Sequence, residues 1–94
     1  MSVYVIVPFH TTDYGEWKGI FDEFASARDA WGAEGYVVYR GLDDPNSVTV
    51  VHHFADREGA ERFMNDPSIR AGIGYWNAPQ VPDIHVYEEV DRLF

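Results

Sequence analysis

The sequence predicts an α+β domain in which four antiparallel strands form one sheet and helices cover one face of it. Two observations predict this fold. Strand-like and helical segments follow one another in the order strand, helix, strand, strand, helix, strand. The strand segments 3–7, 36–39 and 48–51 carry large apolar residues at odd and even positions alike, so both faces of the sheet are apolar. Two helical segments cover only one face, and we expect a second copy of the chain on the other.

The composition is that of a small acidic domain. The chain has 94 residues, 7 basic and 16 acidic side chains, a formal charge of −9 and no cysteine. This length is typical of a single domain, 1–94. The charge disfavours nucleic acid, which needs clustered Lys and Arg, and the lack of cysteine excludes disulfides and thiolate metal sites. Residues 1–9 lack a basic leader and are too few to span a bilayer, so we expect a cytoplasmic protein without a membrane partner.

The first predicted strand, at about residues 3–9, leads into a long amphipathic helix. The candidate N-caps are Thr11, Thr12 and Asp13, and Glu16 follows Asp13 at the spacing of a capping box. Large aromatic residues and one arginine then recur at alternating spacings of four and three: Trp17, Phe21, Phe24, Arg28 and Trp31. Gly32 and Gly35 suit the turn that ends such a helix.

Two strands joined by a hairpin follow, at residues 36–41 and 48–54. The connection at 42–47 contains Asp, Pro, Asn and Ser, which favour turns. A last strand is predicted at about 84–90, beyond a bend framed by Pro79 and Pro82.

The second helical segment is predicted as two consecutive helices. Asp56 caps the first of them, in which three apolar residues share a face: Ala60, Phe63 and Met64. Asp66, with Pro67 at the first helical position, starts the second, which is short. The residues that share a side of this short helix are Ile69, Ile73 and Trp76. Two glycines are expected to end it, Gly72 and Gly74.

This order gives a ferredoxin-like βαββαβ arrangement, a four-stranded antiparallel sheet with helices on one face. Right-handed crossovers place both helical segments on the same face. The bare face is removed from water when it stacks on the same face of a second copy. The predicted assembly is therefore a homodimer that forms a dimeric α+β barrel.

Two stretches add a resemblance to a known family. They are Val-Val-His-His-Phe-Ala-Asp at 50–56, running into Ala-Glu-Arg-Phe at 60–63, and Asn-Asp-Pro-Ser-Ile at 65–69 before a glycine-rich turn. In these stretches, in its length and in its element order, the chain resembles the dimeric α+β barrel proteins of the antibiotic biosynthesis monooxygenase-like group. The resemblance covers nearly the whole chain. An aromatic closes the third strand in such families, where Phe54 stands here. Similar barrels include cofactor-free oxygenases, polyketide cyclases, haem-degrading enzymes and proteins with no known activity, so the resemblance implies architecture more than function.

No cofactor is expected. The resemblance would place a haem-ligating histidine in the turn after Pro67, but residues 68–74 contain none, and haem needs an axial donor. The sequence has no Gly-rich phosphate loop or dinucleotide fingerprint, so flavin and nicotinamide have no support. His52 and His53 point to opposite faces of a regular strand and cannot close on one metal ion.

The histidines are the best candidates for chemistry, because imidazole exchanges its proton near neutral pH. If Val48, Val50 and Phe54 lie under the helices, His52 shares their side and is the candidate catalytic base. His53 then faces the dimer interface, and a bulge would exchange the two. A hydrogen-bonded histidine packed at the sheet edge is the alternative role of His52. Spacing assigns no role to the other two histidines, His10 and His85.

Aromatic residues supply the candidate ligand-binding positions. Most are expected in the core. Three lie at predicted helix ends or in a loop, where side chains commonly rim a cavity: Trp31, Tyr75 and Trp76. A pocket with such rings and one histidine suits a flat aromatic or polyketide-like phenol. Three functions stay open: a cofactor-independent monooxygenase, a polyketide cyclase and a non-catalytic binding or assembly protein.

Overall fold

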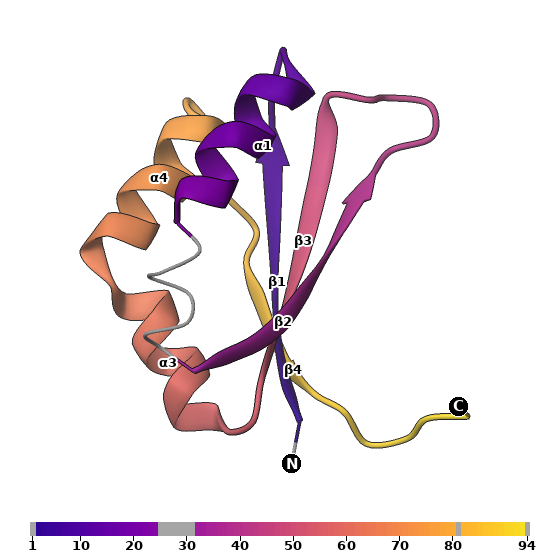
Figure 1. Cartoon of the computed structure of the whole chain (residues 1–94), viewed down its shortest axis with the longest axis vertical. Helices are drawn as coiled ribbons and strands as arrows, with labels where there is room; N and C mark the ends of the chain where they lie inside the picture. Colours follow the sequence, from indigo (N-terminus) through magenta and orange to yellow (C-terminus); the bar gives the residue numbers. More distant parts are fainter. Residues whose placement is uncertain (1, 25–31, 81, 94) are drawn as a thin grey trace.

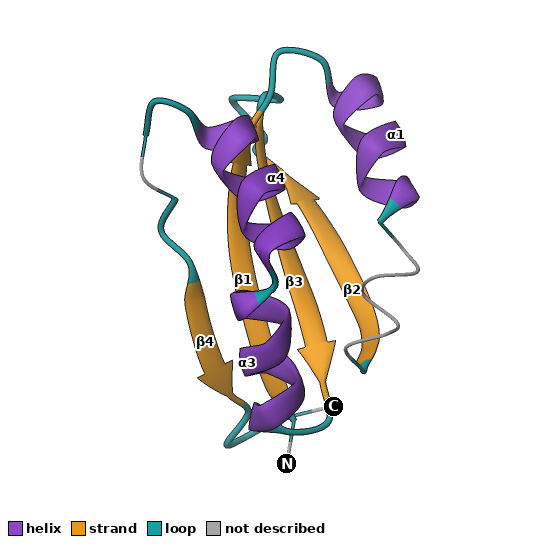
Figure 2. Ribbon diagram, turned by 90° about the vertical axis from the view of Figure 1, so that its left-hand side faces the viewer, coloured by secondary structure: helices purple, strands orange, loops and turns teal. Residues whose placement is uncertain are grey.

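The computed structural model describes residues 2–24, 32–80 and 82–93. Its elements are β1 (Val3–His10), α1 (Tyr14–Glu23), β2 (Ala33–Arg40), β3 (Ser47–Phe54), α3 (Arg57–Asn65), α4 (Pro67–Asn77) and β4 (His85–Glu88). The strands form one antiparallel sheet in the order β2-β3-β1-β4, and the helices lie on one side of it (Figures 1 and 2). The predicted α+β, ferredoxin-like fold is confirmed.

The alternation of side chains divides the sheet into a covered face and an open face. On β1, Val3, Val5, Val7 and Phe9 are buried beneath the helices, and the residues between them are only half-buried. β1 and β3 pair without interruption from Val3 opposite Phe54 to His10 opposite Ser47. Within the described strands, the register is irregular in β2, between Ala33 and Gly35. Val48, Val50 and Phe54 are buried, so the condition set by the strand pattern is met: His52 lies on the covered face and His53 on the open face.

Aromatic side chains join α1 to the covered face. Trp17 is 1% exposed, and its ring centroid lies 5.2 Å from that of Phe9 and 5.0 Å from that of Phe21. Phe21 in turn contacts Tyr36 of β2 at 5.0 Å. Full burial of one large apolar side chain stabilises the fold by about 1.5–3 kcal/mol, so these contacts fix α1 firmly on the sheet.

The helix α1 begins where the sequence predicted and is described from Tyr14 to Glu23. Asp13 caps it as expected, with Oδ1 accepting a hydrogen bond from the Glu16 N–H at 3.0 Å. The helix ends at Glu23, and the N–H of the C-cap residue Phe24 donates to the carbonyls of Phe21 and Asp22. Asp22 and Glu23 put negative charge at the C-terminal end of the helix, where the helix dipole disfavours it. The predicted continuation through Arg28 and Trp31 lies outside the described residues.

The glycines of α4 do not end it, contrary to the prediction. α4 runs for 11 residues from Pro67 to Asn77, through both Gly72 and Gly74. Each interior glycine costs about 1 kcal/mol relative to alanine, but burial of Ile69 and Ile73 outweighs that cost. Tertiary packing has therefore overridden local propensity in this helix.

Two strands also differ from the prediction by more than one residue at a boundary. β2 begins at Ala33, three residues before the expected start, because its pairing with β3 continues past the irregularity. β4 covers only His85–Glu88 of the predicted 84–90, since its ladder with β1 extends from Val3 to Ile6.

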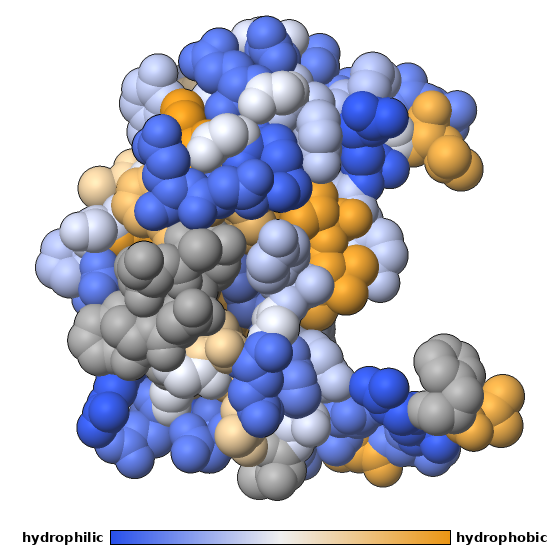
Figure 3. All heavy atoms as spheres, in the orientation of Figure 1, coloured by the Kyte–Doolittle hydropathy of each residue, from blue (hydrophilic) through white to orange (hydrophobic). Residues whose placement is uncertain are grey.

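The open face is flanked by two projecting segments. In Figures 1 and 3 the β2–β3 connection, residues 41–46, and the C-terminal segment, residues 89–93, extend on the side away from the helices, with a hollow between them. Hydrophobic side chains gather in this hollow (Figure 3). Val37 and Tyr39 of β2 and Tyr87 of β4 are 49%, 57% and 52% exposed. The single chain thus leaves an apolar sheet face in water.

Candidate functional site

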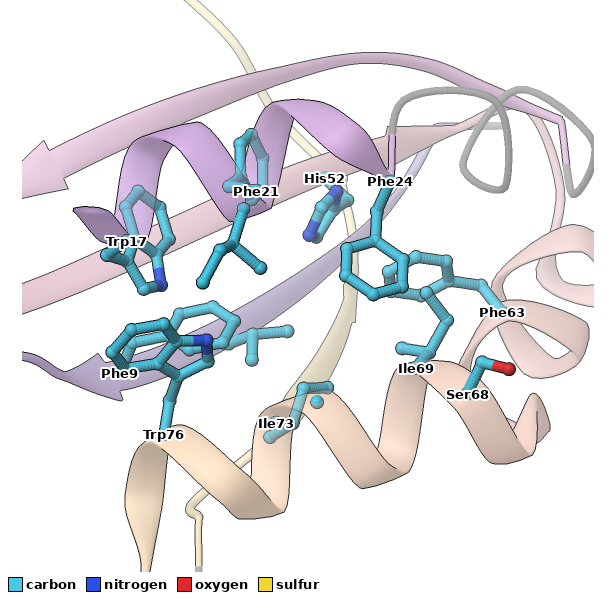
Figure 4. A pocket seen from close by; sticks show the side chains of 13 residues that line it. Phe9, Trp17, Phe21, Phe24, His52, Phe63, Ser68, Ile69, Ile73 and Trp76 are labelled. Carbon is cyan, nitrogen blue, oxygen red and sulfur yellow. The ribbon is translucent and has the colours of Figure 1, made fainter. Parts of the chain in front are cut away.

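A small pocket lies between α1, α4 and the covered face of the sheet (Figure 4). Its volume is about 60 Å³. Side chains from β1, α1, β3, α3 and α4 line it: Val7, Phe9, Trp17, Ile20, Phe21, Phe24, His52, Phe63, Ser68, Ile69, Gly72, Ile73 and Trp76. Residues distant in the sequence therefore meet at one site.

His52 lies on the sheet side of this pocket. The side chain comes from the covered face of β3, between Val5 of β1 and Tyr36 of β2 in the pairing register. It is 2% exposed, and its ring centroid lies 4.7 Å from that of Phe63 and 6.1 Å from that of Phe21. Figure 4 shows the imidazole directed into the space between α1 and α4. His52 is thus held in one orientation by packed rings.

The opposite side of the pocket is α4, which is fixed at both ends. At its start, Asp66 Oδ1 accepts hydrogen bonds from the N–H groups of Ser68 at 2.8 Å and Ile69 at 3.2 Å. At its end, the buried Asn77 Nδ2 donates to the Pro8 carbonyl and to the Ile73 carbonyl, both at 2.9 Å. The first of these two bonds joins α4 to β1. Trp76, the neighbour of Asn77, is positioned by the same attachment.

The lining is apolar with a few polar groups. Among the described lining residues none is charged, and the polar side chains are His52, Ser68 and the indoles of Trp17 and Trp76. Few polar groups in an apolar cavity are typical of small-molecule sites. Imidazole can take up a proton, and an indole N–H can donate a hydrogen bond to a developing oxyanion.

The pocket is too small for an aromatic ligand as it stands. An apolar cavity of about 150 Å³ binds benzene in other proteins, whereas this one measures about 60 Å³. A ring-shaped ligand therefore requires lining side chains to move. Trp76 and Phe24 are the large lining rings that are only half-buried.

The predicted ligand-binding residues are divided by the structure. Trp76 lines the pocket. Tyr75 does not, because successive helical residues point about 100° apart; it is 72% exposed and its ring contacts Trp76 at 5.3 Å. Trp31 lies outside the described residues. Of the three predicted positions, the structure thus brings one, Trp76, together with His52.

The other histidines lie away from the pocket. On the open face, His53 stacks on Tyr4 at 5.0 Å, and its Nε2 lies 3.8 Å from Glu34 Oε1. His10 is exposed at the end of β1. In β4, the exposed His85 has its Nε2 2.9 Å from Asp83 Oδ1. The described part of the chain contains no group of three or more His, Cys, Asp or Glu placed to hold a metal ion.

Sequence reasoning did not identify Ser68, Gly72 and Ile20 as lining residues. Ser68 and Gly72 are four residues apart and adjoin the apolar side of α4, while Ile20 lies three residues after Trp17, so helical spacing was the available signal. Trp17, Phe21 and Phe63 were assigned to the core. They are buried as predicted, and they also form walls of the pocket.

Comparisons with known proteins agree with the fold. The chain is similar in structure to SnoaB, a cofactor-independent oxygenase from Streptomyces nogalater, with a TM-score of 0.75, 16% identity, and coverage of 98% of this chain and 96% of SnoaB. Rv0793 from Mycobacterium tuberculosis gives a TM-score of 0.74 and 17% identity over 100% of both chains. An antibiotic biosynthesis monooxygenase gives 0.70 and 13% identity, over 97% of this chain and 100% of the other.

No family model and no curated protein matches the sequence. At these identities the likeness shows the fold, and the resemblance to antibiotic biosynthesis monooxygenase-like barrels is confirmed at that level. No helix in the described residues is long and apolar enough to cross a membrane.

Proposed function

We propose that this protein binds a small aromatic or polyketide-like phenol in the pocket beside His52 and acts on it as a cofactor-independent monooxygenase. The observation that carries the proposal is the placement of His52. It is the one titratable side chain among the described lining residues, and aromatic rings hold it in place. The likeness in fold to SnoaB, a cofactor-independent oxygenase, supports the same reaction class.

His52 acts as the base. A neutral imidazole has one ring nitrogen that can accept a proton. It removes a proton from the phenol, or from an activated C–H of its tautomer, and the electron pair stays on the substrate as a phenolate-carbanion. The Trp76 indole N–H, also in the pocket, donates a hydrogen bond to the developing oxyanion.

Dioxygen is the oxidant and the source of the new oxygen atom. The carbanion reduces O₂ and forms a C–O bond to it, and the resulting peroxide takes back the proton from the imidazolium. Loss of water, with the second hydrogen of the same carbon, leaves a ketone. The net change is R₂CH₂ + O₂ → R₂CO + H₂O. The substrate supplies all four electrons, so no other reductant is needed.

The homodimer belongs to the same proposal. A second copy on the open face would cover Val37, Tyr39 and Tyr87, which are about half exposed in the single chain. Stacked sheets bury such faces, and an isologous pair uses the same surface on both subunits. The cytoplasmic location and the single-domain extent expected from the sequence remain predictions.

Two other functions fit the same geometry. In a polyketide cyclase the carbanion would attack a carbonyl of the same molecule instead of O₂. In a non-catalytic binding or assembly protein His52 would only fill the core, and its contacts with Phe21 and Phe63 favour that interpretation. Consumption of O₂ distinguishes the monooxygenase from the cyclase. Turnover distinguishes either enzyme from a non-catalytic protein.

The test is oxygen uptake with a polycyclic phenol that has an activated methylene group, followed in a sealed cell with product analysis by mass spectrometry. We expect one O₂ consumed per ketone formed, and loss of turnover in His52→Gln. The matched control is His10→Gln, which changes an exposed histidine outside the pocket and should keep full activity. An isomer of the substrate or its dehydration product, formed without O₂ uptake, would indicate the cyclase. Unchanged turnover in His52→Gln would remove His52 from the mechanism.

A further inference from the structure

The segment after β4 turns Glu89 and Arg92 toward Tyr4 of the sheet and leaves its apolar side chains exposed. We call residues 89–93 the C-terminal arm. The Glu89 N–H donates to the Ser2 carbonyl at 2.9 Å. Tyr4 Oη donates to Glu89 Oε2 at 3.1 Å and accepts from Arg92 Nη2 at 2.9 Å, while Arg92 Nε also pairs with Glu89. In the same arm, Val90 and Leu93 are 83% and 96% exposed.

These polar contacts alone stabilise the position of the arm only weakly. Fixing one residue of backbone costs more free energy than an exposed ion pair returns. Burial of aliphatic side chains supplies stabilisation of the required size, and Val90 and Leu93 are the aliphatic residues of the arm.

The arm lies where a partner on the open face would meet it. It projects at one end of that face, while residues 41–46 project at the other end on the same side (Figures 1 and 3). A standard interface buries about 800 Å² per partner. The projecting segments add their own surface to that of the open face.

The distribution of charge over the open face also fits a second copy. The central positions Ile6, Val37 and Val51 are apolar. The charged or titratable groups lie toward one end, at Glu34, His53, Glu89 and Arg92, or on the edge strand β4, where His85 pairs with Ile6. An apolar centre with a polar rim is typical of protein interfaces. In Tyr4, Glu89 and Arg92 a carboxylate is neutralised by a guanidinium, so the base of the arm adds no net charge.

We propose that the C-terminal arm is an interface element of the homodimer, in which Val90 and Leu93 of each copy pack on the other copy. The cluster of Tyr4, Glu89 and Arg92 sets the direction of the arm. The inference rests on the proposed homodimer and adds the element that secures it. In an isologous dimer each arm residue makes two symmetry-related contacts, one from each copy.

Sedimentation equilibrium over a dilution series of the full chain tests the proposal. Leu93→Ser should raise the dimer dissociation constant about 100-fold, because two leucine side chains lose their burial. Arg92→Gln should raise it about tenfold by releasing the arm. Tyr75→Ser is the matched control, since it removes an exposed aromatic from α4, on the helical side of the molecule, and should leave the constant unchanged.

Each outcome has a distinct meaning. A wild-type dimer weakened by Leu93→Ser but not by Tyr75→Ser supports the arm. A wild-type dimer that Leu93→Ser leaves unchanged overturns the arm and leaves the homodimer standing. A wild-type monomer throughout the dilution series overturns the homodimer and the arm together, while oxygen uptake still tests the role of His52 separately.

Discussion

Replacing His52 with phenylalanine should separate its chemical role from its packing role. The ring at this position contacts Phe63 at 4.7 Å and Phe21 at 6.1 Å, and a void of about 60 Å³ adjoins it. A phenyl ring keeps these contacts, and the void accommodates its extra volume. We expect the free energy of unfolding of His52→Phe to stay within about 1.5 kcal/mol of wild type, as for shape-conserving core changes.

His52→Ala provides the comparison. It removes the ring and enlarges the void, so we expect it to cost about 3 kcal/mol, near the lower end of the range for Phe→Ala changes in cores. For a domain of this size that corresponds to a fall in Tm of about 12–24 °C. Urea unfolding followed by tryptophan fluorescence measures stability, and oxygen uptake measures turnover. The account predicts that His52→Phe is stable and inactive. An active His52→Phe, or one as unstable as His52→Ala, would refute the reasoning.

Two further predictions concern the glycines and the C-terminal arm. Gly72→Ala should stabilise the protein by about 0.5–1 kcal/mol, because its Cβ would meet no atom within 4 Å. Gly41→Ala should destabilise the protein, because its Cβ would lie 2.6 Å from the Asp44 carbonyl oxygen. The urea unfolding midpoint should therefore rise in Gly72→Ala and fall in Gly41→Ala. Hydrogen bonds from Arg92, and to a smaller extent from Tyr4, lower the pKa of Glu89. The contact is therefore complete at pH values above the ordinary glutamate pKa of about 4.3, and it is lost as the pH falls through the lowered pKa. Protection of the arm amides, measured relative to the intrinsic exchange rate at each pH, should fall in that acidic range, and an arm already unprotected at neutral pH would contradict the contact.

Alternation along β3 was sufficient to place His52 and His53 on opposite faces of the sheet, but only the structure shows which of the two faces the helices cover. The strand pairs with β1 without interruption, so odd and even positions keep their faces from end to end. The irregularity occurs in β2, where it moves a strand boundary and leaves both histidines in place. A period of two is a strong predictor when the strand is regular, as it is here.

Helical segments were harder to predict because their limits depend on tertiary contacts. Gly72 and Gly74 suggested an end to α4, but the buried Asn77, bonded to the Pro8 carbonyl, holds the helix to its last residue. That bond joins residues 69 positions apart, so no local sequence pattern predicts it. Tyr75 and Trp76 were taken together as ligand-binding, and only the geometry of the fixed helix shows that one of them faces the pocket.

The central claim is that one face of the sheet holds the His52 pocket while a second copy covers the other face. Native mass spectrometry of freshly purified protein tests it most directly, because one spectrum gives both the number of chains and any retained small molecule. The account predicts a species with the mass of two chains, with any retained ligand in the mass range of a small aromatic molecule. A species with the mass of one chain at micromolar concentration would contradict it.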